Sequence, residues 1–152
     1  MKKSTVTKFL VALAVLAFTV SAGRRASAAG DSKIFEIREK MFIEQCNDIY
    51  LNPDDYAGRR IKLEGIYEEN VDEESGEIFR YVFRYGPGCC GNDGVAGFEC
   101  VVEPGALPKR GDWVEAIGTV EVGQDADGLD YVVLKPSRLT VMEKRGAEYV
   151  NN

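Results

Sequence analysis

Apolar and polar residues alternate along five stretches of the chain, the pattern of strands that bury one face. In the second stretch, for example, Phe79, Tyr81 and Phe83 fall on one face. Turn-forming residues separate the stretches, as in the exposed run 70–77. The predicted strands are 59–69, 78–86, 97–103, 112–124 and 129–142, the last interrupted by Pro136.

One short helix is predicted near residues 44–51, where Cys46, Ile49 and Tyr50 recur at helical spacing. Pro53 ends this run, whereas the apolar positions of 34–42 fit either a strand or the start of a helix. Five strands with so little helix indicate an all-β fold. Because Gly118 offers a bend or bulge in a long strand, we expect a small five-stranded OB-like Greek-key barrel with one short helix. Composition alone does not separate this barrel from an SH3-like barrel or a sandwich.

The first 28 residues have the character of a signal peptide. Three lysines precede a short apolar run over 9–20, and small residues then flank Ser27. The run is shorter than the roughly 20 residues that span a bilayer. We therefore expect export to an extracytoplasmic or secreted location, with no direct membrane insertion after cleavage. Residues 29–152 would form a single OB-like domain with its core at about 41–142, followed by a frayed tail over 145–152.

Charge narrows the range of partners. The chain has 19 basic and 25 acidic residues, and residues 1–28 hold five of the basic ones and none of the acidic ones. Without that segment 14 basic and 25 acidic residues remain, a net charge of −11. Such a charge repels nucleic acid and anionic lipid surfaces, so no nucleic-acid partner is expected.

Several motifs together resemble the C-terminal domain of the YcgQ-like family (DUF1980, UPF0703 group). The resemblance covers about residues 41–142, and its most specific element is an Arg-aromatic pair followed by Cys-Cys-x-x-Asp. It implies an OB-type barrel and a membrane permease-like protein as partner. The chain differs in having a signal-like segment where that family has several transmembrane helices. The matching residues are Tyr56, Gly58, Arg60, Gly65, Arg84, Tyr85, Cys89, Cys90, Asp93, Trp113, Val114 and Gly118.

The four cysteines allow three interpretations. In an exported chain, Cys89 and Cys90 can each form a structural disulfide with Cys46 or Cys100, or the thiols are simply buried. Alternatively, thiolates bind soft or borderline metal ions such as zinc or copper(I). Adjacent cysteines can also switch between thiols and a strained disulfide, which would make the chain a thiol-redox protein.

A metal site is the functional hypothesis that the sequence favours among these. Glycines around Cys89 and Cys90 would let both thiols turn toward one point, where Asp93 can join them. A more distant thiol, Cys46 or Cys100, would complete the ligand set. Two cations on the preceding strand, Arg80 and Arg84, are expected to favour thiolate over thiol.

Enzymatic catalysis finds little support in the sequence. The chain has no histidine, which excludes Ser-His and Cys-His catalysis. The acidic loop 125–130 lacks the final glutamate of a calcium-binding loop and is more typical of a hairpin end. Four aromatic residues can form a ligand-binding face, although core packing explains them equally well: Tyr67, Tyr81, Phe83 and Tyr85. The predicted function is an exported, non-enzymatic binding or accessory module.

Overall fold

Five long strands make up most of the protein. The computed structural model describes residues 33–89, 91–103, 105–125 and 128–151. Each long strand corresponds to one of the alternating stretches, so the predicted all-β fold is confirmed. The strands are β2 (Arg60–Val71), β3 (Ile78–Gly88), β4 (Gly91–Cys100), β5 (Trp113–Gln124) and β6 (Asp130–Val141).

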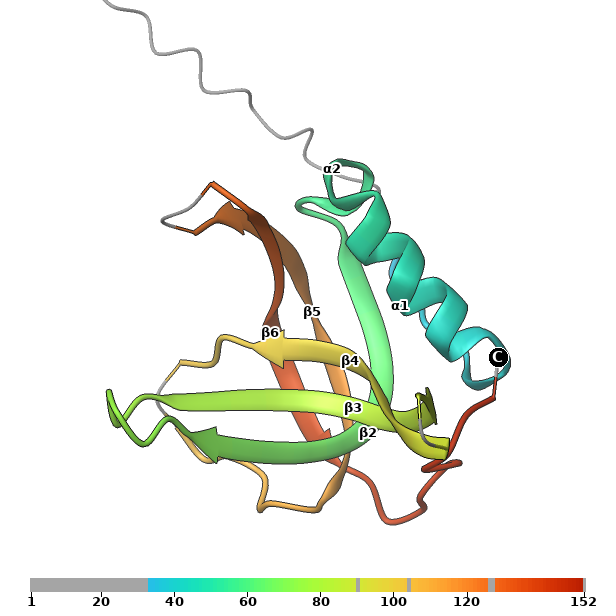
Figure 1. Cartoon of the computed structure of the whole chain (residues 1–152). Coiled ribbons are helices and arrows are strands. Elements are labelled where there is room, and N and C mark those ends of the chain that lie inside the picture. Colours follow the sequence, from blue (N-terminus) through green and yellow to red (C-terminus); the bar gives the residue numbers. More distant parts are fainter. Residues whose placement is uncertain (1–32, 90, 104, 126–127, 152) are drawn as a thin grey trace, which may run out of the picture.

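The strand pairings close on themselves. β2 pairs antiparallel with β3 through its second half and with β5 through its first half. β3 pairs antiparallel with β4 and β5 with β6, while a short parallel pairing joins β4 to β6 at Glu99 and Cys100. The order β2-β3-β4-β6-β5 therefore returns to β2, as in a five-stranded Greek-key barrel of the OB type. Figure 1 shows β5 and β6 crossing the layer of β2, β3 and β4.

The helical part of the chain lies before the barrel. A short strand, β1 (Phe35–Glu36), pairs in parallel with β2 and leads through the 3₁₀ turn η1 (Glu39–Met41) into α1 (Phe42–Leu51). α1 buries Phe42, Cys46 and Ile49, which recur at the spacing of one helical face. A single further turn, α2 (Pro53–Tyr56), begins with proline at a position where no backbone N–H is needed. The predicted helix is thus confirmed, with one additional turn at each end.

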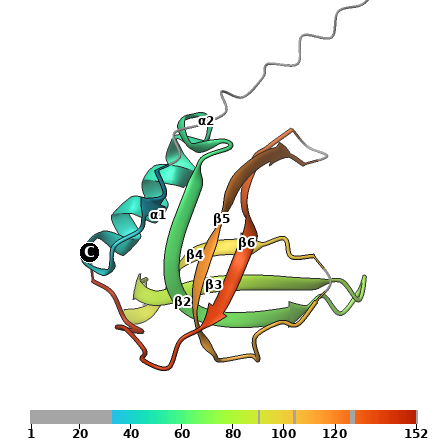
Figure 2. The same ribbon diagram turned by 180° about the vertical axis from the view of Figure 1, so that it is seen from behind.

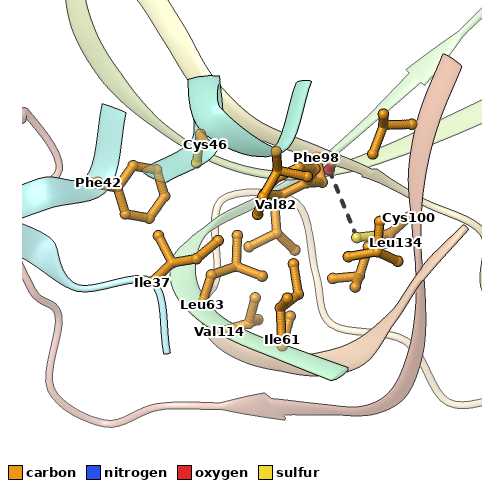
Figure 3. Packing of buried hydrophobic residues seen from close by; sticks show 14 of the residues in the cluster. Ile37, Phe42, Cys46, Ile61, Leu63, Val82, Phe98, Cys100, Val114 and Leu134 are labelled. Atoms are coloured by element: carbon orange, nitrogen blue, oxygen red, sulfur yellow. Dashed lines mark hydrogen bonds between the residues drawn. The ribbon is translucent and has the colours of Figure 1, made fainter. Parts of the chain in front are cut away.

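The inward-facing residues of the strands and of α1 form one hydrophobic core. Ile61, Leu63, Val82, Phe98 and Leu134 are almost completely buried. Figure 3 shows these side chains in one cluster with Ile37 and Phe42 from the segment before the barrel. Burial of this apolar surface is the main favourable contribution to folding.

The C-terminal segment is not the frayed tail that the sequence predicts. The backbone N–H of Tyr85 donates to the carbonyl of Glu148 at 2.8 Å, and that of Val150 donates to the carbonyl of Tyr85 at 2.9 Å. The ring of Tyr149 stacks on that of Tyr85, with centroids 5.1 Å apart, and Val150 is buried. In Figure 2 this segment runs from the end of β6 back toward the start of α1. The free edge of β3 beyond its pairing with β2 holds the segment in place.

The predicted start of β4 was wrong, whereas β6 has nearly the predicted bounds. β4 begins at Gly91 rather than at residue 97, because glycines can pair in a sheet although they leave no alternating pattern in the sequence. β6 continues through Pro136, which pairs with Gly118 at a shift in the β5–β6 register. The bulge expected at Gly118 is therefore present, and it accommodates the proline.

Candidate functional site

The two adjacent cysteines lie at the turn of the hairpin between β3 and β4. Gly88 and Gly91 form the last pair of this hairpin, so residues 89 and 90 alone connect the strands. Cys89 is exposed. Cys90 lies outside the described residues, so the structure gives no position for the second thiol of the expected metal site.

Asp93 folds back onto the same hairpin. A Cβ atom added at Gly88 would collide with the carboxylate of Asp93, and its Cγ would be 2.9 Å away. Only glycine at position 88 leaves room for this carboxylate, which therefore lies against the residue next to Cys89. The structure thus brings Asp93 and Cys89 to the same end of the hairpin.

Cys46 and Cys100 are not brought to the hairpin turn. Both are buried free thiols of the hydrophobic core, Cys46 on α1 and Cys100 at the far end of β4, as Figure 3 shows. At about 3.3 Å per residue along a strand, the nine steps from Gly91 to Cys100 correspond to roughly 30 Å. Neither is paired in a disulfide, so the bridged scaffold considered from the sequence does not apply to these two residues.

Burial also makes these two thiols poor ligands. The pKa of Cys46 and that of Cys100 are each raised to about 12, chiefly because burial disfavours the thiolate. The thiol of Cys100 donates to the carbonyl of Phe98 at 3.7 Å. Over residues 33–89, 91–103, 105–125 and 128–151, the structure assembles no group of three His, Cys, Asp or Glu residues suited to a metal ion.

The two arginines that the sequence associates with the thiols both bind carboxylates elsewhere in the fold. Arg84 is buried inside the barrel, where its guanidinium donates to the carboxylate of Glu39 at 2.9 Å and to the carbonyl of Glu64 at 2.7 Å. Arg80 forms an ion pair with Glu69 at 3.0 Å. Both cations are therefore held on the inward face of β3 by carboxylates of other segments.

A second candidate site lies where β4 has no neighbour other than β3. A cleft of about 610 Å³ opens there between α1, the outer face of β3 and the unpaired part of β4. Its size is within the range of small-molecule sites, about 300–1,000 Å³. Its lining is Cys46, Asn47, Tyr50, Glu68, Asn70, Tyr81, Phe83, Val95, Ala96, Gly97, Phe98, Glu99 and Val132.

Strand register arranges the polar part of this cleft. On the outer face, Tyr81 pairs with Glu68 of β2 on one side and with Glu99 of β4 on the other. One aromatic ring thus lies between two carboxylates. In the next row of the same face, Phe83 pairs with Gly97.

Tyr50 forms the wall opposite this face. Its hydroxyl donates to the carbonyl of Gly97 at 2.9 Å, and its ring stacks on that of Phe98 with centroids 5.2 Å apart. A Cβ atom at position 97 would overlap the backbone of β3 at Val82 and Phe83. Glycine at position 97 therefore allows β3 and β4 to approach each other closely beside the cleft.

The two carboxylates of the cleft differ in their neighbours. Glu68 forms an ion pair with Arg110, which lowers the pKa of that carboxyl group. The pKa of Glu99 is raised, first by burial and second by the negative charge of Glu77. Within the described part of the chain, no Lys or Arg lies at ion-pair distance from Glu99.

A comparison with protein-family models identifies the family of this chain. The chain matches the DUF1980 C-terminal domain over residues 18–152. It belongs to that family. The comparison with curated proteins finds no match. The resemblance expected from the sequence is thereby confirmed.

Two of the motif residues that suggested the DUF1980 C-terminal domain hold the barrel together. The guanidinium of Arg84 lies 4.8 Å from the ring centroid of Trp113 and equally far from that of Phe42. Tyr56 is buried, and its hydroxyl donates to Asp48. These residues therefore serve the scaffold, whereas Cys89 and Asp93 lie at an exposed turn.

The aromatic face expected in this DUF1980 C-terminal domain is present in part. Tyr81 and Phe83 line the cleft, but Tyr67 points inward and is buried, where it donates to Glu69 at 2.7 Å. Tyr85 instead packs on Tyr149 of the C-terminal segment. Sequence reasoning missed Tyr50 and Glu99, because helical spacing and strand alternation do not reveal which helix residue faces which strand.

None of the helices in the described residues is both long and apolar enough to cross a membrane.

Proposed function

We propose that this DUF1980 C-terminal domain is an exported, non-enzymatic binding module, and that its ligand occupies the cleft between α1, β3 and β4. The observation that carries the proposal is the combination of an aromatic floor and a partly buried carboxylate in one cleft. Tyr81 and Phe83 supply the floor, and Glu99 supplies a charge that no neighbouring cation in the described chain balances. Mostly apolar clefts with a few polar groups are the usual form of ligand sites.

The proposed location and partner of the protein are based on its sequence. The signal-like character of residues 1–28 supports export, and the family resemblance supports an accessory role beside a membrane permease-like protein. A module in this position would bind a solute outside the cell and present it to that partner. The acidity of the chain argues against an oligonucleotide as the ligand.

A fragment screen by saturation-transfer NMR tests the binding function even though the ligand is unidentified. We expect several fragments to bind the wild-type domain and to lose most of their signal with the variant Tyr81→Ala, which removes the centre of the floor. The matched control is Tyr131→Ala, because Tyr131 is an exposed tyrosine of β6 outside the cleft. Equal signals from the two variants, or no binding to the wild type, would contradict the proposal.

A second candidate function is thiolate metal binding at the hairpin turn. The specific observation that favours it is the carboxylate of Asp93 lying against Gly88, beside Cys89. Cys89, Cys90 and Asp93 would then supply three ligands to zinc or copper(I), and the fourth position would stay open to water or to a partner. Cys46 and Cys100 are not in this ligand set, since they lie in the core.

Native mass spectrometry of the reduced protein tests this second candidate. The wild type should retain one zinc or copper(I) ion, and the folded double variant Cys89→Ser, Cys90→Ser should retain none. Cys100→Ala is the control, because a buried thiol far from the turn should not matter. A reduced wild type that takes up no metal would rule out the site. A reversible disulfide between Cys89 and Cys90 would instead favour the redox alternative.

A further inference from the structure

The charge of the cleft limits which ligands it can hold. Two carboxylates, Glu68 and Glu99, flank the ring of Tyr81 on the outer face of the sheet. Glu68 is balanced by Arg110, whose side chain is 66% exposed. Glu99 has no such balance within the described residues, so an anion entering the cleft would meet uncompensated negative charge.

The aromatic groups beside Glu99 suit a cation as well. Glu99 pairs with Tyr81 across β3 and β4, and the hydroxyl of Tyr50 donates to the carbonyl of Gly97, two residues before Glu99, so the three side chains line the same part of the cleft. Aromatic faces attract ammonium groups through the ring quadrupole, with energies of about 0.5–2 kcal/mol. A positive group here would gain this attraction and would also offset the cost of burying the carboxylate.

Apart from Asn47 and Asn70, the remainder of the cleft is mostly apolar. Phe83, Val95, Phe98 and Val132 line it beyond the carboxylate. Such a surface accommodates a hydrocarbon or aromatic body attached to the charged head. The cleft therefore offers one place for a positive charge and a larger place for an uncharged part.

The structure also disfavours an extended peptide as the occupant. Binding a peptide as an additional strand requires free backbone groups along a sheet edge. At the unpaired edge of β4, the hydroxyl of Tyr50 already occupies the carbonyl of Gly97. A small molecule that fits within about 610 Å³ does not need that edge.

We propose that the cleft binds a small organic ammonium compound, with its cationic head at Glu99 between Tyr50 and Tyr81 and its apolar body over Phe83 and Val95. This inference rests on the proposed binding function and adds the chemical class of the ligand. Specificity for cations would then come from the unbalanced carboxylate, which repels anions of the same shape.

Isothermal titration calorimetry with three probes of one shape tests the proposal. The probes are 4-phenylbutylammonium, the neutral 4-phenylbutan-1-ol and the anion 4-phenylbutyrate. We expect the cation to bind at least tenfold more tightly than the alcohol and the anion not to bind. Its affinity should fall as ionic strength rises, whereas that of the alcohol should not change.

Two variants test whether the carboxylate of Glu99 is the source of the preference for the cation. Glu99→Gln keeps the size of the side chain and should reduce affinity for 4-phenylbutylammonium at least tenfold, while affinity for the alcohol stays within twofold. Glu121→Gln on β5 is the control, because it removes an exposed carboxylate outside the cleft and should leave both affinities unchanged. Circular dichroism establishes that each variant is folded.

The outcomes separate this inference from the proposed function. If the cation and the alcohol bind equally, the ammonium preference is wrong while the cleft remains a binding site. If no probe binds although other fragments do, the ligand class is wrong. If the fragment screen is empty as well, both proposals fail. If an oligolysine peptide binds at Glu99 and 4-phenylbutylammonium does not, a basic protein segment rather than a small molecule is the ligand, and the inference is overturned.

Discussion

Arg84 is a charged side chain inside the barrel whose donors find acceptors on other segments. It contacts Glu39 from η1, Glu64 from β2 and the carbonyl of Ala147 from the C-terminal segment, the last at 3.1 Å. Its guanidinium also lies over the rings of Phe42 and Trp113. One residue thus connects the segments that precede and follow the barrel to the barrel itself. The planar fork of arginine suits this task better than the single ammonium of lysine.

Replacing Arg84 by leucine should lower the free energy of unfolding by about 3 kcal/mol, because it removes the hydrogen bonds that the buried guanidinium donates to Glu39, Glu64 and Ala147. Urea denaturation measures this. Arg145→Leu is the control, since Arg145 lies over the same Trp113 ring at 5.6 Å but has a side chain that is 43% exposed. The control should cost less than about 1 kcal/mol. Equal losses in the two variants would contradict the structural role of Arg84.

The carboxylate of Glu39 should make stability depend on acid pH. The N–H of Ala147 and the guanidinium of Arg84 hold the pKa of Glu39 below its ordinary value of 4.5. A carboxyl group with a lowered pKa in the folded state stabilises the protein above pH 4.5, and this contribution is lost as the pH falls through the lowered pKa. Glu39→Gln should therefore flatten the stability curve below that pH, as measured by urea denaturation. An unchanged curve would contradict this.

The cysteines should differ in reactivity according to their burial. With the protein reduced and folded near neutral pH, iodoacetamide should modify Cys89 and leave Cys46 and Cys100 intact, because the pKa of each buried thiol is raised to about 12. Peptide mass spectrometry identifies the labelled residues, and the same reaction in urea is the control. Rapid labelling of Cys46 in the folded protein would mean that α1 does not cover the core as described.

At the scale of elements, the C-terminal segment acts as an extension of the sheet. It adds a parallel bridge to β3 at Tyr85 and supplies two contacts to the cluster around Arg84 through Ala147. Val150 enters the core at its end. The barrel and the helix before it are thus joined by residues that follow the last strand.

Truncation after Arg145 should lower the free energy of unfolding by about 3 kcal/mol, from the lost burial of Val150 and the lost hydrogen bonds. Truncation after Val150 is the control and should change it by less than about 0.5 kcal/mol, because Asn151 is exposed. Thermal and urea unfolding of the two proteins test this. If both truncations are equally harmless, the segment does not contribute to the fold.

The elements that the sequence predicted well are those with strong alternation. β2, β3 and β5 appear close to their expected bounds, and α1 follows from its helical spacing. The early part of β4 was missed because the residues from Gly91 to Gly97 include three glycines and give no alternation. The docking of the C-terminal segment was missed because its partners, Tyr85 and Arg84, are distant in sequence.

The same limit applies to the candidate sites. Part of the aromatic face was predicted, since strand alternation placed Tyr81 and Phe83 on one side of β3. Alternation could not show that Tyr50 of α1 lines the same cleft. The ligands of the predicted metal site were chosen because thiolates and carboxylates bind metals. In the structure, Cys46 and Cys100 lie apart from the turn that holds Cys89. Ligand sets depend on distances across the fold, which spacing along the chain does not contain.

At the scale of the whole molecule, the fold places two different surfaces on one hairpin. β3 and β4 carry the cysteine turn at one end and the cleft beside their middle and far end. The net charge of −6 for the full chain favours cationic over anionic ligands at long range. The barrel is thus a rigid support for sites formed by side chains on its outer face, as is common for proteins of this architecture.

Chemical-shift mapping with ¹⁵N-labelled protein tests the central claim, that the cleft is the binding site, most directly. The best fragment from the screen is titrated into residues 29–152, and backbone amide shifts are followed to saturation. We predict saturable shifts concentrated at Tyr50, Tyr81, Gly97 and Glu99, with the cysteine turn unaffected. Shifts confined to the hairpin turn or to the opposite side of the barrel, or no saturable shift with any fragment, would contradict it.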